Sequence, residues 1–162
     1  MKAFVYQDEH RLEILVPLIP VPASRPRITV RKVRGRATGM AYFDGRYKQF
    51  RDDYAHLLSK VKIQRYEGGL EVYTNVYIPR PRTTKKLWPK GDNDNYEKAC
   101  WDGLNGVAWA DDDQIVINRT VKAFTELDPR ICIQVRSLEP ERMKRTLLWS
   151  ERLSKRWQDE SQ

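Results

Sequence analysis

Alternating apolar positions over residues 70–78 constrain the fold of this chain more than any other feature. One side of the segment carries Leu70, Val72, Thr74, Val76 and Ile78, and the other carries Glu71, Tyr73, Asn75 and Tyr77. Side chains alternate between the two faces of a β-strand, so this pattern predicts a strand with one buried face. A half-buried strand needs neighbouring strands and a second layer that covers it.

The remaining periodic segments predict those partners. Strands are expected over 12–18, from Asp113 or Gln114 to Thr125, and over 131–135, with the last two forming a hairpin that turns at Asp128-Pro129. Helical spacing predicts helices over 47–61 and from about Asn95 to Asn105. Residues 23–36 are interpreted as a basic loop or a β-ribbon returning through 40–43, and residues 79–90 as an irregular loop. The sequence therefore predicts a two-layer α+β fold, a mixed β-sheet with helices packed on one face.

Length and composition exclude several classes of protein. A chain of 162 residues with 40% hydrophobic content suits one domain with a core of its own. No apolar run is long enough to span a bilayer, and the start of the chain lacks the apolar core of a signal peptide, so a cytoplasmic location is expected and no membrane partner. Cys100 and Cys132 are far apart and the chain has two histidines, so a structural zinc site is not expected and both thiols are interpreted as buried.

The charge is distributed unevenly. Residues 91–113 hold seven acids and one base, a net charge of −6, whereas the whole chain carries +8. The other 139 residues therefore sum to +14, which predicts a surface that attracts polyanions such as nucleic acid.

The acidic segment suggests metal chemistry. Clustered carboxylates repel one another, and they would also repel the phosphates of a bound polyanion. A divalent cation bound among them relieves both repulsions. Magnesium prefers oxygen ligands and keeps positions open for water and phosphate. The hypothesis is that the first residues of the 114–125 strand lie beside the first residues of the preceding helix. It also assumes that the alternation of side chains in this strand continues back to Asp112. Asp92, Asp94 and Asp112 would then converge, with Lys98 and Lys122 beside them.

Each part of this segment also has a purely structural interpretation. Asp94 and Lys98 are spaced as an ordinary i, i+4 pair, Asp92 or Asp94 could cap the helix, and residues 111–113 could form a solvated turn. An EF-hand is excluded, because counting from Asp92 puts Glu97 where that loop needs glycine. The density of acids in an otherwise basic chain favours metal binding over these separate explanations.

Two basic stretches flank the acidic segment in sequence. Phosphate contacts are expected from Arg25, Arg27, Arg80, Arg82, Lys85 and Lys86. A solvated surface is the alternative for each stretch. No helix-turn-helix, zinc finger or RNA-binding signature is present.

The central motif resembles a known family. The residues that carry the resemblance are Asp92-x-Asp94-Asn95-x-x-Lys98-x-x-x-Asp102-x-Leu104-Asn105-Gly106-Val107 and then Trp109-x-Asp111-Asp112-x-Gln114. With Pro20-x-Pro22-x-x-Arg25-x-Arg27 upstream and Lys122 downstream, the likeness covers about residues 12–137 and is to the RusA family of Holliday junction resolvases. These are bacterial and prophage-associated enzymes, so a bacterial or phage-infected cell is the expected host.

The resemblance implies an activity, a cofactor and site residues. It implies a homodimeric endodeoxyribonuclease that resolves four-way DNA junctions by paired symmetric nicks and leaves 5′-phosphate ends. Magnesium, with manganese as a possible substitute, is the implied cofactor, and no small-molecule cofactor is expected. The catalytic aspartates carry over to Asp92, Asp94 and Asp112, which also bind the metal, and the catalytic lysine to Lys98, with Asp111 and Lys122 in support. Residues 1–138 would form the RusA-like nuclease domain.

Two departures and two alternatives stay open at this point. Asp113 extends the acidic pair, and Tyr96 stands where smaller or aliphatic residues are commoner in the family. The alternatives are a metal-dependent nuclease for other branched DNA and a non-catalytic junction-binding protein. Residues 139–162 are expected to form a basic, helical extension, in which Trp149, Leu153 and Trp157 recur at helical spacing. The dimer surface is expected among the apolar residues of the 114–137 segment or of this extension.

Overall fold

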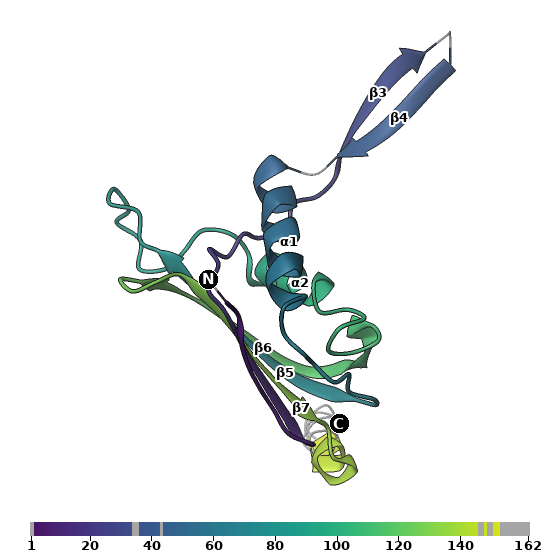
Figure 1. The fold of residues 1–162 in the computed structure, drawn as a ribbon, viewed down its shortest axis with the longest axis vertical. Helices are drawn as coiled ribbons and strands as arrows, with labels where there is room; N and C mark the ends of the chain where they lie inside the picture. Colours follow the sequence, from purple (N-terminus) through teal and green to yellow (C-terminus); the bar gives the residue numbers. More distant parts are fainter. Residues whose placement is uncertain (1, 34–35, 43, 146–147, 149–150, 153–162) are drawn as a thin grey trace, which may run out of the picture.

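A computed structural model describes residues 2–33, 36–42, 44–145, 148 and 151–152 (Figure 1). The elements follow the chain in this order: β1 (Phe4–Gln7), β2 (Arg11–Val16), β3 (Arg27–Val33), β4 (Arg36–Tyr42), α1 (Gly45–Leu58), β5 (Leu70–Pro79), α2 (Asn93–Asp102), the 3-10 turn η1 (Asp112–Gln114), β6 (Ile115–Thr125) and β7 (Arg130–Ser137). None of the helices in the described residues is long and apolar enough to cross a membrane.

Five strands form one mixed sheet in the order β1-β2-β7-β5-β6. The β5–β6 pair is parallel and the other three pairs are antiparallel. Parallel neighbours need a crossover connection, and α2 is the helix of that connection. Both α1 and α2 lie on the same side of the sheet (Figure 1), which confirms the predicted α+β architecture.

The structure corrects two expectations about the strands. The first strand is β1, so the strand expected over 12–18 is the second, and it ends at Val16. The strands β6 and β7 do not form a hairpin, because β5 lies between them and pairs with both. The short connection after Thr125 crosses the end of β5 instead of closing a two-stranded turn.

The strands β3 and β4 form a β-ribbon, the second of the two alternatives left open for the basic segment. They pair antiparallel, from Arg27 with Tyr42 to Val33 with Arg36, as a separate two-stranded sheet. The ribbon projects away from the main sheet and the helices (Figure 1).

The core lies between the sheet and the helices. The inward side chains of β2, β5 and β7 are buried, and α1 buries Tyr47, Phe50, Tyr54, Leu57 and Leu58 against them. Asp44 starts α1, because its carboxylate accepts a hydrogen bond of 3.0 Å from the backbone N–H of Arg46. The thiol of Cys100 is buried and that of Cys132 is half-buried.

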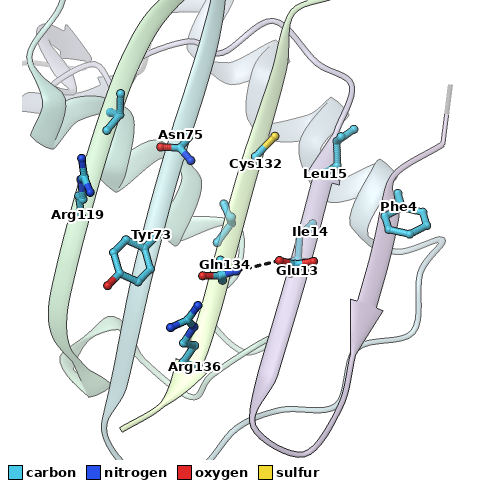
Figure 2. A pocket seen from close by; sticks show the side chains of 12 residues that line it. Phe4, Glu13, Ile14, Leu15, Tyr73, Asn75, Arg119, Cys132, Gln134 and Arg136 are labelled. Atoms are coloured by element: carbon cyan, nitrogen blue, oxygen red, sulfur yellow. Dashed lines mark hydrogen bonds between the residues drawn. The ribbon is translucent and has the colours of Figure 1, made fainter. Parts of the chain in front are cut away.

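The other face of the sheet is not covered by α1 or α2. Figure 2 views this face, with the helices behind the sheet. It has a shallow hollow of about 640 Å³ lined by Phe4, Glu13, Ile14, Leu15, Tyr73, Asn75, Arg119, Val121, Cys132, Ile133, Gln134 and Arg136. Gln134 donates a hydrogen bond of 2.8 Å from Nε2 to Oε1 of Glu13 across it.

The start of the C-terminal extension docks at one end of this uncovered face. Residues 140–145 are helical, as expected for the first part of 139–162. Arg142 donates a hydrogen bond of 2.5 Å to Oε1 of Glu71, a carboxylate that is almost fully buried. The hydroxyl of Tyr73 donates to the same oxygen at 2.6 Å. The predicted stripe of Trp149, Leu153 and Trp157 lies outside the described residues.

Candidate active site

The acidic segment enters its helix over the edge strand of the sheet. Gly91 makes the turn into α2 with a positive φ of 92°, a conformation that side chains with a Cβ rarely adopt. Its carbonyl accepts a hydrogen bond from Nζ of Lys122 on β6. The side chain of Asn93 donates to the carbonyl of Thr120 at 3.2 Å. These contacts place the start of α2 over the later part of β6.

Asp92 and Asp94 lie exposed at this end of α2. Asp92 has the position of an N-cap, but its side chain makes no capping hydrogen bond. The capping explanation therefore does not account for Asp92. Asp94 lies in the first helical turn, where a negative charge interacts favourably with the helix dipole.

The far end of α2 carries a second group of polar side chains. Nζ of Lys98 lies 3.6 Å from Oδ1 of Asp102, and the hydroxyl of Tyr47 on α1 donates to Oδ2 of Asp102 at 3.3 Å. Burial is the main cause that raises the pKa of Tyr47, and the Asp102 carboxylate adds to it. Asp102 and Tyr47 were not among the predicted site residues, although the i, i+4 spacing of Lys98 and Asp102 is a signal that the sequence does carry.

The residues before β6 form a capped turn. Asp111 is the N-cap of η1, its carboxylate accepts from the N–H of Asp112 at 2.8 Å, and Gln114 completes a capping box. Because residues 112–114 form a 3-10 turn, the alternation of β6 does not extend back to Asp112, contrary to the sequence expectation. The alternative interpretation of residues 111–113 as a turn before the strand therefore accounts for Asp111.

Asp112 lies in an acidic environment. Partial burial raises the pKa of its carboxyl group, the nearby carboxylates of Asp111 and Asp102 raise it further, and the Lys98 ammonium opposes them. Asp111, Asp102 and Lys98 therefore lie close enough to Asp112 to act on its charge.

The start of β6 lies beside the end of α2, and not beside its start as expected. The reason is topological, since a crossover helix between two parallel strands runs antiparallel to them. Ten residues of helix separate Asp92 from Asp102, a rise of roughly 15 Å. In the described part of the chain, no group of three or more histidine, cysteine, aspartate or glutamate side chains could hold a metal ion. The oxygen ligands suit magnesium in kind, but one chain does not assemble the predicted set of Asp92, Asp94 and Asp112.

The basic residues predicted to contact DNA lie in two segments, Arg25 and Arg27 at the entry to the ribbon and the other four in the loop after β5. Arg25, Arg80, Arg82, Lys85 and Lys86 are exposed, and the side chain of Arg27 lies outside the described ones. Arg80 also has a structural role, because its guanidinium lies 5.2 Å above the ring of Phe124.

The fold and this edge define a class of protein: a basic α+β domain in which acids and a lysine lie beside an edge strand, with exposed bases in the loop that packs on that strand. Comparison with known families is more specific. The family model described as Endodeoxyribonuclease RusA matches residues 17–136, which is most of the chain. The chain belongs to the RusA endodeoxyribonuclease family, and this membership implies Holliday junction resolvase nuclease activity. A search of curated proteins gives no match.

Proposed function

We propose that this protein resolves four-way DNA junctions by paired symmetric nicks that leave 5′-phosphate ends, and that it needs magnesium to do so. The observation that carries the proposal is the ion pair of Lys98 with Asp102 inside the family-matched region, close enough to Asp112 for both groups to act on its charge. A cation next to carboxylates can support phosphodiester hydrolysis, since it stabilises the negative charge that develops on the phosphate.

The side chains of the chain have separate roles in this proposal. Lys98 would neutralise charge on the phosphate that is attacked, and Asp102 would hold the ammonium in place while Tyr47 orients that carboxylate. Asp92 and Asp94 at the start of α2, and Asp112 near its end, are the proposed magnesium ligands, but within one chain these two groups are too far apart to share a single ion. When bound, magnesium would supply an activated water and offset the charge of the carboxylates.

Cleavage of a synthetic immobile junction tests the nuclease activity. Wild type should cut in magnesium and not in EDTA, while Asp92→Asn and Asp112→Asn should lose cutting and still bind, because each removes a negative charge that repels phosphate. Asp113→Asn is the matched control and should cut normally. Normal cutting by Asp92→Asn or Asp112→Asn would show that the site assignment is wrong.

The same assay separates the alternatives. A nuclease for other branched DNA would cut flaps or forks faster than junctions. A non-catalytic junction-binding protein would bind the four-way junction tightly and leave it intact in magnesium and in manganese.

The positioning role of Asp102 has a test of its own. Asp102→Asn leaves Tyr47 with a hydrogen-bond partner but removes the charge that holds Lys98. We expect cutting to fall while junction affinity is retained, whereas Lys98→Ala should abolish cutting. If Asp102→Asn cuts like wild type, Lys98 is positioned by other contacts.

DNA binding by the 80–90 loop is measured by salt dependence. Arg82→Ala with Lys85→Ala should reduce the slope of log affinity against log salt by about one unit for each phosphate that is no longer neutralised. Arg80→Ala is less suitable for this test, because Arg80 also packs on Phe124. An unchanged slope would mean that neither side chain contacts DNA.

We also propose that the protein acts as a homodimer, whose two-fold symmetry matches that of the junction. The uncovered sheet face supports this proposal, because it exposes Phe4, Leu15 and Val121. Glu13 and Arg119 lie in one cross-strand row on opposite sides of the central strand β7. If two such faces stack about a two-fold axis that runs along the strands, Glu13 of one copy would lie towards Arg119 of the other.

This dimer is tested by a charge placed at one of two exposed positions of β6, one on the uncovered face and one at the irregular start of the strand. Val121→Asp on the uncovered face should convert the dimer to monomer in analytical ultracentrifugation. Val116→Asp, an exposed valine on the same strand, is the matched control and should leave the dimer intact. A monomeric wild type at concentrations that cut junctions would refute the dimer proposal.

A further inference from the structure

The loop between β5 and α2 holds two large apolar side chains in solvent. Leu87 is 78% exposed and Trp88 is 58% exposed. Tryptophan is among the more buried residue types on average, so an exposed indole beside a candidate active site is informative. The indole lies four residues before Asp92 in the chain.

Contacts on the N-terminal side of Trp88 close the loop. Nη2 of Arg80 donates to the carbonyl of Lys86 at 3.3 Å, and the N–H of Lys86 donates to Oγ1 of Thr84 at the same distance. The guanidinium of Arg80 lies above the Phe124 ring on β6. The loop is therefore fixed to the sheet just before Leu87.

Contacts on the C-terminal side fix the chain again at once. Pro89 is buried, the carbonyl of Lys90 accepts a hydrogen bond of 3.0 Å from the hydroxyl of Tyr96, and the carbonyl of Gly91 accepts from Lys122. Leu87 and Trp88 thus stand out between two anchored points, which gives the indole a defined place instead of a fraying loop end.

The charge of the loop identifies the kind of ligand. Residues 80–90 contain five bases and no acid: Arg80, Arg82, Lys85, Lys86 and Lys90. Cationic side chains beside an exposed aromatic ring are the combination that binds nucleic acid with accessible bases, because phosphates pair with the cations and rings stack on nucleobases. In a duplex the faces of the nucleobases are covered by their neighbours, whereas at a branch point they can be exposed.

We propose that Trp88 stacks on a nucleobase exposed at the branch point and so makes the protein prefer branched DNA to plain duplex. This inference rests on the proposed function, since it names the part of the DNA that the same site recognises. The basic residues of the loop bind phosphates of any DNA, and Trp88 adds the contact that only a branch offers.

Binding of a four-way junction and of a linear duplex with the same arm sequence, in EDTA to prevent cutting, tests the proposal. Trp88→Ala should weaken junction binding by about five- to 150-fold and change duplex binding by less than about twofold. Trp88→Phe is the matched control that keeps a ring and should retain most of the junction affinity. Trp88→Leu keeps bulk without an aromatic face and should behave like Trp88→Ala.

A fluorescent base at the branch point gives a second readout. With 2-aminopurine next to the branch, wild type and Trp88→Phe should change its emission on binding, and Trp88→Ala should not. Unchanged junction affinity of Trp88→Ala would overturn the proposal. An equal loss of affinity for the duplex, or wild-type junction affinity of Trp88→Leu, would overturn it as well. A change of oligomeric state in Trp88→Ala would mean that the indole contacts a second copy, which also overturns it.

The failure of this inference can be told apart from the failure of the proposed function. If wild type binds the junction no better than the duplex, junction recognition itself fails. If wild type prefers the junction and Trp88→Ala shows the same preference, only the role of Trp88 fails.

Discussion

Substituting Gly103 by alanine tests how the end of α2 is held against α1. A Cβ at this position would lie 2.4 Å from Cδ1 and 2.5 Å from Cε1 of the Tyr54 ring. Ordinary contacts between carbon atoms are about 3.5–4.0 Å, so the two groups would have to separate by more than about 1 Å. Tyr54 is 1% exposed and stacks on Phe50, with ring centroids 5.5 Å apart, so its ring has little room to move.

Overpacking of this kind costs about 1–3 kcal/mol of unfolding free energy. For a domain of this size that corresponds to a fall in melting temperature of about 2–12 °C. Because Gly103 follows Asp102, a shift of the helix end also displaces the Asp102 carboxylate from Lys98. We therefore expect a lower cutting rate as well, since a misplacement of about 1 Å can cost on the order of a hundredfold.

Urea unfolding followed by circular dichroism measures the stability change. Gly45→Ala is the matched control, because no atom lies within 4 Å of a Cβ built there, and it should leave stability unchanged or raise it by up to about 1 kcal/mol. Gly103→Ala should cost less in a Tyr54→Leu background, where the ring is absent. Equal stability of Gly103→Ala and wild type, or the same cost in both backgrounds, would refute the reasoning.

Three further predictions concern the core and the uncovered face. Burial raises the pKa values of both thiols, and that of Cys100 most. Iodoacetamide at pH 8 should therefore label Cys132 slowly and Cys100 only after unfolding. Early labelling of Cys100 would contradict its burial. Glu71→Gln weakens the hydrogen bond to Arg142. It should lower the free energy of unfolding in urea by about 1–2 kcal/mol and make residues 140–145 accessible to protease. Protease resistance equal to that of wild type would show that this bond does not dock the extension. The hydrogen bond from the Gln134 amide lowers the pKa of Glu13 most, and the Arg11 guanidinium lowers it further. Ionised Glu13 therefore stabilises the fold above its unfolded pKa of about 4.3. This stabilisation is lost as the pH falls through the lower pKa of the folded state. Thermal melts from pH 6 to pH 2 should therefore fall less steeply for Glu13→Gln, and parallel curves would argue against this contribution.

Local patterns in the sequence were sufficient to predict most elements. The alternation from Leu70 to Ile78 predicts β5, and the helical spacing from Tyr47 predicts α1. For the basic segment the sequence left a loop and a ribbon open, and the structure shows the ribbon. These elements depend on the side-chain periods of strands and helices, which are properties of a few consecutive residues. The start and end of α2 were displaced by two or three residues, and β1, with four residues, was missed.

Pairing between distant segments could not be obtained in this way. Nothing local to residues 114–137 shows that β5 inserts between β6 and β7, and a short connection with a turn sequence predicts a hairpin equally well. The same limit applies to the site. The family motif singled out Lys98 and Asp112, but only the crossover topology places Asp112 at the end of α2, next to Asp102 and one helix length from Asp92.

The sequence by itself determined the family, the kinds of side chain at the site and the excess of positive charge outside it, because these follow from residue identity and spacing. The tertiary structure decided which carboxylates are neighbours, that Tyr47 from a different helix bonds to Asp102, and that Trp88 is held in solvent between two anchored points. These features depend on contacts between segments far apart in the chain, and such contacts are set by the packing of the whole sheet and its helices.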